Sequence, residues 1–249
     1  MVSVIASTHT SEVTNSSGDH RVGVWTVVVA AGVGQRFGGP KQLLDLGGRR
    51  VVDRSVALAA RVSESVVVVL PPEVDLGYDE WGSVPIVSAI GGPSRSASVR
   101  NGLSLVPDQA DVVVIHDGAR PLASPELFVK VVQAVRGGAD AVVPVVPVVD
   151  SVRHRVSGPV DRTDLVAVQT PQAFAAELLR AAHQTGHDAT DDATLVEAIG
   201  GQVVLVDGEV DNLKITTPHD LLVAEGIVGR RDDASDGQSE ESSREDHHE

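Results

Sequence analysis

The sequence predicts an α/β fold in which helices cover both faces of a doubly wound, mainly parallel sheet. Short runs rich in valine alternate with helical patterns, and these runs are apolar at nearly every position. Strands that are buried on both faces of a parallel sheet have this composition. The predicted strands are 24–29, 66–70, 86–90, 112–115, 141–146 and 203–206. The predicted helices are 51–61, 94–106, 125–136, 171–184, 191–199 and 218–228.

Local signals support individual elements of this pattern. Ser124 precedes Pro125, and Thr217 precedes Pro218, so each of these helices starts with a polar cap and a proline in its first turn. Residues 147–170 have no helical period and contain a Gly-Pro turn, which predicts a projecting β-arm. Such an arm needs a partner surface and favours a homodimer, although an ordinary surface loop remains the alternative.

Composition defines the ends of the domain and excludes several classes of function. Residues 1–23 are polar, and residues 229–249 hold eight acids and three arginines, so both segments are predicted to be disordered around a single domain at 24–228. The net charge of −15 argues against a nucleic-acid partner. The absence of cysteine excludes disulfides and thiolate sites. No apolar run is long enough to cross a membrane and no secretory signal is visible, which predicts a soluble, cytoplasmic protein.

The most informative segment is the glycine-rich stretch 30–41, which directly follows the first predicted strand. It holds four glycines together with Arg36 and Lys41, a combination suited to binding a polyphosphate. A Walker A loop is excluded because Gln42, not Ser or Thr, follows Lys41. A dinucleotide fingerprint is disfavoured because the glycines are spaced one residue too widely. A glycine-rich turn without a ligand remains the alternative.

Three further groups of polar residues follow predicted strands, where ligands collect in open α/β sheets. Asp117 comes just after 112–115 and is a candidate Mg²⁺ ligand, with a turn or helix cap as its alternative, whereas His116 is predicted to pack structurally. Residues 91–98 open a helix with glycines and hydroxyls and could bind an anion or a base. Lys214, predicted inside an apolar strand, either reaches the surface or faces a ligand.

Four segments, taken in chain order, resemble the 2-C-methyl-D-erythritol 4-phosphate cytidylyltransferases, and the likeness extends over about 24–228. These segments are 30–42, 116–121, 169–172 and 212–216. The resemblance implies a fold like that of nucleotide-diphospho-sugar transferases, Mg²⁺ as cofactor, and CTP and a sugar-alcohol phosphate as substrates. It implies transfer of CMP to 2-C-methyl-D-erythritol 4-phosphate, with release of pyrophosphate, in non-mevalonate isoprenoid biosynthesis. It also implies a homodimer formed through the arm.

The resemblance further implies a role for individual residues. Arg36, Lys41 and Lys214 are expected to make catalytic contacts to the CTP phosphates, and Asp117 is expected to bind Mg²⁺. The cytidine pocket is expected to be lined by Ala30, Ala31, Gly32, Gly92 and Ser98. Arg120 and Thr170 are expected near the sugar phosphate, and Arg162 is expected to reach the acceptor phosphate from the partner's arm.

The acceptor alcohol is less certain than the nucleotide. The chain has Asp150-Ser151-Val152-Arg153 where the family often has Asp-Thr followed by lysine, and an arginine fork does not replace an ammonium closely. A ribitol-5-phosphate cytidylyltransferase is therefore one alternative. A catalytically silent relative that only binds nucleotide is the other.

Overall fold

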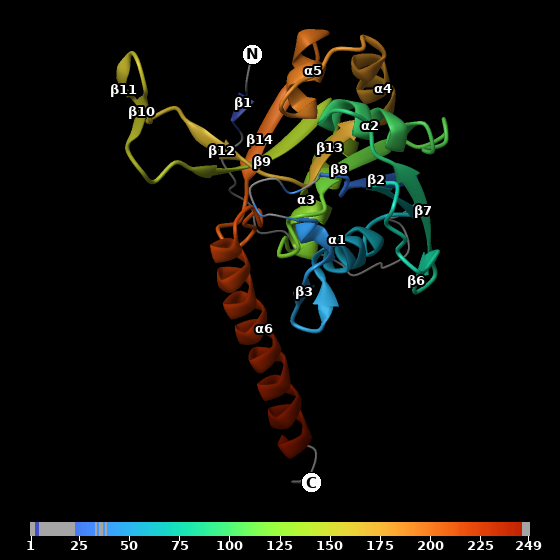
Figure 1. Cartoon of the computed structure of the whole chain (residues 1–249), viewed down its shortest axis with the longest axis vertical. Helices are drawn as coiled ribbons and strands as arrows, with labels where there is room; N and C mark the ends of the chain where they lie inside the picture. The colour runs from blue at the N-terminus through green and yellow to red at the C-terminus, as the bar shows by residue number, and fades with distance from the viewer. Residues whose placement is uncertain (1–2, 5–22, 33, 35–36, 38, 246–249) are drawn as a thin grey trace.

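The computed structural model describes residues 3–4, 23–32, 34, 37 and 39–245, so Arg36 lies outside the described residues. A single mixed sheet runs through the body, in the order β1-β14-β9-β13-β8-β2-β5-β7-β6, and helices pack on both of its faces (Figure 1). The predicted fold class is confirmed. The strands along this order are β1 (Ser3–Val4), β14 (Val203–Asp207), β9 (Ala141–Pro147), β13 (Gln172–Ala175), β8 (Val112–Asp117), β2 (Val24–Val29), β5 (Ser65–Leu70), β7 (Val84–Ile90) and β6 (Glu80–Trp81).

The centre of the sheet is parallel, and its strands are buried on both sides. β2 pairs in parallel with β8 and β5, and β5 pairs in parallel with β7. All six residues of β5 are buried, as are all six of β8, which explains why the sequence shows continuous apolar runs rather than alternation. The carboxyl ends of these strands therefore reach the same edge of the sheet.

Two apolar clusters fill the space between the sheet and its helices. One contains Val66 and Val68 of β5 with residues of α1 and α3, and the other contains Val67 and Val69 with residues of α2, α4 and α5. Neighbouring residues of one strand thus enter opposite layers, as the pleat requires. The helices of the body are α1 (Val51–Ala60), α2 (Arg95–Leu103), α3 (Pro125–Arg136), α4 (Ala176–Gln184) and α5 (Asp192–Ala198). A short 3-10 helix, η1 (Lys41–Leu43), and a small hairpin, β3 (Asp45–Leu46) and β4 (Arg49–Arg50), precede α1.

One predicted helix is wrong in its first part. Residues 172–175, predicted to begin a helix at 171, form β13, and the helix α4 starts only at Ala176. β13 is antiparallel to both β8 and β9 and fills the gap between them. Phe174 is fully buried there, so packing between two strands overrides the helical pattern of the local sequence.

The predicted arm projects from the sheet (Figure 1). Its tip is an antiparallel hairpin of β10 (Val152–His154) and β11 (Gly158–Val160). The returning strand β12 (Val166–Val168) pairs with β9 and joins the arm to the sheet. Val149 and Val156 are 79% and 90% exposed, so the arm presents apolar side chains to the outside.

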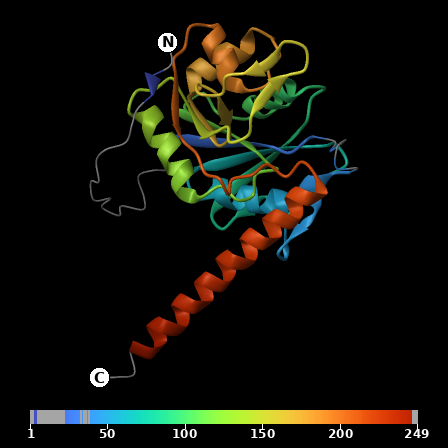
Figure 2. The ribbon, with the colours of Figure 1, turned by 90° about the vertical axis from the view of Figure 1, so that its left-hand side faces the viewer.

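The described residues of both ends that were predicted to be disordered include regular structure, whereas residues 1–2, 5–22 and 246–249 lie outside the described residues. Ser3 and Val4 form β1, which pairs in parallel with β14. The last helix, α6 (Pro218–Glu245), continues well past the predicted end at 228 and projects away from the body (Figure 2). Its first turns are held by Ala224, Ile227 and Val228, which pack in a third apolar cluster. No proline follows Pro218 to break the helix, although its three glycines, Gly226, Gly229 and Gly237, each weaken it. None of the described helices has the length and apolarity that a membrane span requires.

Candidate active site

A cavity of about 660 Å³ opens at the carboxyl ends of the central strands. The register places Val29, the last residue of β2, opposite Asp117, the last residue of β8, so the glycine-rich segment begins beside the carboxylate. The cavity wall is completed by the start of α2 and by the chain that leads into α6. Its lining residues are Val29, Ala30, Ala31, Gly32, Gly34, Phe37, Lys41, Gln42, Gly92, Pro93, Ser94, Arg95, Ser98, Asp117, Ala119, Lys214 and Thr216.

Small residues bring the walls of this cavity close together. A Cβ added to Gly118 would lie 2.9 Å from the Ala30 Cβ, and one added to Gly92 would lie 2.5 Å from the Ala97 Cβ. The Ser98 hydroxyl donates to the Ser94 carbonyl at 2.9 Å and accepts from the Gly92 amide at 3.0 Å. Ser98 therefore fixes the turn that precedes α2.

Asp117 is the electrostatic centre of the site. Lys214 Nζ lies 2.7 Å from its Oδ2, and the Nε atoms of Arg95 and Arg120 each lie 3.8 Å from one of its carboxylate oxygens. Burial favours the neutral acid, but the three cations outweigh burial and lower the Asp117 pKa to about 2. The carboxylate is therefore ionised at neutral pH and faces the cavity.

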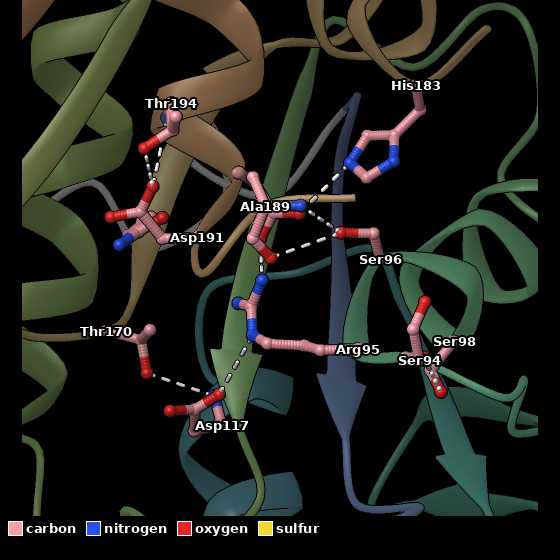
Figure 3. Close-up of polar contacts among 12 residues, drawn as sticks. Ser94, Arg95, Ser96, Ser98, Asp117, Thr170, His183, Ala189, Asp191 and Thr194 are labelled. Carbon is pink, nitrogen blue, oxygen red and sulfur yellow. Dashed lines mark hydrogen bonds and ion pairs between the residues drawn. The ribbon is translucent and has the colours of Figure 1, made fainter. Parts of the chain in front are cut away.

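His116 and Thr170 support Asp117 from behind. The Thr170 hydroxyl accepts from the Asp117 amide at 3.0 Å (Figure 3). The same hydroxyl contacts His116 Nδ1 at 3.2 Å. His116 Nε2 lies 3.1 Å from the Arg120 carbonyl and donates to it. Burial lowers the His116 pKa to about 4, so the ring is neutral and Nδ1 accepts from the threonine hydroxyl. His116 is structural, as the sequence predicts, and its ring lies 4.9 Å from that of Phe128.

Two of the sequence segments that carried the resemblance interlock in space. The Asn212 amide donates to the Thr170 carbonyl at 2.9 Å and to Gln169 Oε1 at 3.2 Å. Gln169 also donates to the Glu209 carbonyl at 2.7 Å. Together these bonds fasten the chain leading to Lys214 against the start of β13.

The prediction that Lys214 lies in a strand is wrong. Residues 212–216 pair with no described strand and form a connection without regular structure. The Ile215 amide donates to the Ala119 carbonyl at 2.8 Å and holds this connection in place. Ile215 is fully buried, which explains the apolar pattern around the lysine. The Lys214 side chain is 39% exposed and lines the cavity.

The structure brings most of the predicted site residues to one place. The cavity is lined by Ala30, Ala31, Gly32, Lys41, Gly92, Ser98, Asp117 and Lys214. Arg120, Thr170 and Arg162 do not line it. The Arg120 guanidinium donates to the carbonyls of Asn212 and Val168, and Arg162 donates to carbonyls of its own arm.

Arg95 is a cavity residue that the sequence reasoning missed. It is the first residue of α2, lines the cavity and approaches Asp117. The segment 91–98 stands out in the sequence for its glycines and hydroxyls, and the arginine within it was the available signal. Gln42, whose amide donates to the Gly32 carbonyl at 3.2 Å, and Thr216 also line the cavity and were not selected.

The chain is similar to known proteins in both sequence and fold. Residues 24–230 match the family described as 2-C-methyl-D-erythritol 4-phosphate cytidylyltransferase. A protein of that name from Rhodococcus jostii (strain RHA1) is 43% identical over 217 residues, which cover 82% of this chain and 95% of the relative. One from Rubrobacter xylanophilus is 40% identical over 223 residues, covering 84% of this chain and 96% of the relative.

Solved structures agree with the sequence relatives. The crystal structure of 2-C-methyl-D-erythritol 4-phosphate cytidylyltransferase from Thermus thermophilus superposes with a TM-score of 0.69 at 37% identity, covering 81% of this chain and 97% of the other. A 4-diphosphocytidyl-2C-methyl-D-erythritol synthase from Anaerococcus prevotii superposes with a TM-score of 0.70 at 27% identity, covering 85% of this chain and all of the other.

Proposed function

The chain belongs to the 2-C-methyl-D-erythritol 4-phosphate cytidylyltransferase family, and we propose that it transfers CMP from CTP to 2-C-methyl-D-erythritol 4-phosphate. The products are 4-diphosphocytidyl-2-C-methyl-D-erythritol and pyrophosphate, and the step belongs to isoprenoid biosynthesis. One observation carries the proposal: a single cavity gathers the glycine-rich segment, the start of α2, Asp117 and Lys214, all within the matched region.

The chemistry suits a site built from charges. An oxygen of the acceptor phosphate attacks the α-phosphorus of CTP, a new P–O bond forms, and the bond to the bridging oxygen breaks as pyrophosphate leaves. The attacking oxygen is already anionic near neutral pH, so the reaction needs no general base. Positioning and charge stabilisation supply the catalysis in such transfers.

Lys41 and Lys214 are the described cations that would contact the CTP phosphates. Both line the cavity, and Lys214 Nζ is held 2.7 Å from Asp117, at the centre of the site. A cation fixed where negative charge develops lowers the barrier without reorganisation during the reaction. Arg36, assigned to the same task by the resemblance, lies outside the described residues.

Asp117 would hold Mg²⁺. Mg²⁺ is bound by one or two carboxylates together with substrate phosphates and water, and Asp117 is an ionised carboxylate that lines the cavity. No group of three or more His, Cys, Asp or Glu side chains among the described residues could hold a metal, so this donor set fits an ion shared with the nucleotide. When bound, Mg²⁺ would neutralise charge on the phosphate oxygens.

The cytidine would occupy the part of the cavity whose wall is formed by alanine and glycine residues. Ala30, Ala31, Gly32 and Gly92 line it, and Ser98 fixes the turn at Gly92. A Cβ at Gly32 would meet no described atom within 4 Å, so the room beside this glycine is available to a ligand. A close backbone on this side favours a pyrimidine over a larger purine.

The acceptor side would be completed by a second copy of the chain. Arg162 lies on the arm, away from its own cavity, and the arm exposes Val149 and Val156. Dimerisation through the arm would cover these side chains and deliver Arg162 to the partner's cavity. Arg120 and Thr170, which lie next to Asp117, would shape the same acceptor side. A cytoplasmic location is part of the proposal because the enzyme consumes CTP.

The proposal is tested by pyrophosphate release from CTP and Mg²⁺, with 2-C-methyl-D-erythritol 4-phosphate and ribitol 5-phosphate offered separately. We expect turnover with the first acceptor alone, loss of turnover in excess EDTA and recovery with added Mg²⁺. Turnover with ribitol phosphate alone would overturn the acceptor. CTP binding without turnover on either acceptor would overturn the enzymatic assignment, and full rate in EDTA would remove Asp117 from its metal role.

A further inference from the structure

A row of paired polar side chains runs from the interior to Asp117. His183 Nε2 lies 3.0 Å from Asp192 Oδ1, and Asp192 Oδ2 lies 2.8 Å from Arg95 Nη1. Arg95 Nε then lies 3.8 Å from Asp117 Oδ1, and Figure 3 shows Arg95 reaching between Asp117 and the chain near Ala189. The residues come from α4, α5, α2 and β8 in turn, so the row crosses several packed elements.

Asp192 is fixed more firmly than a surface carboxylate. Its side chain is fully buried, and each of its two oxygens has its own partner, one on either side. The segment before it is tied to α2 by two bonds, in which the Ser96 hydroxyl contacts the carbonyl and the amide of Ala189. Nothing in the proposed reaction uses Asp192, although a buried charge is costly unless it is paired.

Arg95 is shared unequally between two carboxylates. Its contact with Asp192 is a hydrogen bond of 2.8 Å, whereas the distance to Asp117 is 3.8 Å. Attraction between charges rises as the distance falls and as water is excluded. With Asp192 neutralised, Asp117 would attract this guanidinium more strongly than Asp191 does, and a closer contact would occupy the Asp117 oxygen that faces Arg95.

We propose that Asp192 is a positioning residue that, backed by His183, holds Arg95 away from Asp117 and keeps the Asp117 carboxylate available to a divalent cation. The inference rests on the Mg²⁺ role proposed for Asp117. Asp192 and His183 would thereby raise the affinity of the site for the cation. The helices that carry them, α5 and α4, would affect the reaction although neither lines the cavity.

The test is a titration of the full chain, in the presence of CTP and without acceptor, with Mn²⁺ as the probe. Free Mn²⁺ is counted by electron paramagnetic resonance. We expect Asp192→Asn to weaken protein-dependent Mn²⁺ binding about fivefold, because Arg95 moves onto Asp117. Adding Arg95→Gln to this variant should restore binding to the wild-type level or better. The matched control is Asp188→Asn, which removes a carboxylate that contacts Ser94 and Arg100 but not Arg95, and which should leave Mn²⁺ binding unchanged.

Asp192→Asn is expected to weaken Mn²⁺ binding and Arg95→Gln to tighten it. A loss of structure would weaken Mn²⁺ binding in both variants. Arg95→Gln alone should tighten Mn²⁺ binding, so it tests the same idea if Asp192→Asn does not fold. Unchanged binding in Asp192→Asn, or equal weakening in all variants, would overturn the inference while the proposed function stands. Wild-type protein that adds no Mn²⁺ binding to that of CTP alone would overturn the metal role of Asp117 together with the inference.

Discussion

The cavity and the arm are built on different principles. In the cavity, Asp117 contacts Lys214, Arg95 and Arg120, and its amide is fixed by the Thr170 hydroxyl. On the arm, the hydrogen bonds of the Arg162 side chain within the described residues go to the carbonyls of Val148 and Val149. The cavity is preorganised by one chain, whereas the arm leaves its cation and its valines open to a further surface.

This difference suggests that the two substrates depend on different parts of the molecule. Charges held in advance by buried partners stabilise a developing charge well, because they need no reordering when it forms. A cation on an exposed hairpin gains such a setting only when another surface covers it. If the proposed dimer forms, the nucleotide half of the reaction would depend on contacts within one chain, and the acceptor half would depend on a second chain.

Removing the central cation should have the largest effect. We expect Lys214→Ala to lower kcat about a thousandfold, because the α-phosphate loses a fixed charge in the transition state. The measurement is steady-state pyrophosphate release at saturating substrates. Lys130→Ala is the matched control, since this lysine donates to the Asp207 carbonyl on the outside and should leave kcat unchanged. A loss of less than about fivefold in Lys214→Ala would contradict its place at the reacting phosphate.

The neutral His116 behind the cavity should make the fold sensitive to acid. Its pKa is about 4 in the folded chain and about 6.5 in an unfolded one, so between these values the unfolded chain binds the extra proton. The neutral His116 ring therefore contributes on the order of 3 kcal/mol to the free energy of unfolding. This contribution is complete above pH 6.5 and is lost as the pH falls toward 4. Urea unfolding of the wild type and of His116→Asn at several pH values measures it. The same slope in both proteins would contradict the assignment.

A change on the arm should affect one substrate selectively. We expect Arg162→Ala to raise the KM for the acceptor about tenfold and to leave the KM for CTP within about twofold, because the proposal assigns this guanidinium to the acceptor phosphate and not to the nucleotide. Arg155→Ala, which removes an exposed arginine in the turn of the same arm, is the control. Equal effects of Arg162→Ala on both substrates would remove the proposed division between cavity and arm.

The smallest effect is expected at the end of α6. Residues 232–249 lie beyond the matched region, and α6, which ends at Glu245, projects away from the body (Figure 2). Truncation after Arg231, which still donates to the Leu122 carbonyl, should change kcat/KM by less than about twofold. A larger loss would show that this helix serves one of the two substrate regions.

The parts of the fold set by local pattern were predictable. Buried parallel strands such as 24–29 are continuous valine runs, and α3 was predicted over 125–136 because a capped proline start and an apolar period coincide there. β13 was not predictable, because its helical-looking sequence is overridden by the gap between β8 and β9. The connection around Lys214 was mistaken for a strand because Ile215 is buried without strand pairing.

The site was predictable where charge and glycine stand beside a strand end. Asp117 and Lys41 are predicted in this way, and both line the cavity together with Lys214. The contacts behind the site were not visible, because they join residues far apart in the chain. Asp192 and Arg95 are separated by 97 positions, and no local spacing links them. Thr170 was assigned to the substrate by resemblance, whereas the structure occupies its hydroxyl with Asp117 and His116.

The central claim is that a cavity from one chain works with an arm from another, and mixing two impaired variants tests it most directly. Lys214→Ala and Arg162→Ala proteins are unfolded together, refolded and assayed at low acceptor concentration. In a mixed dimer, the cavity with an intact Lys214 receives the arm with an intact Arg162, so activity should recover to about a quarter of the wild-type value. Activity no greater than the sum of the two separate variants would contradict the account.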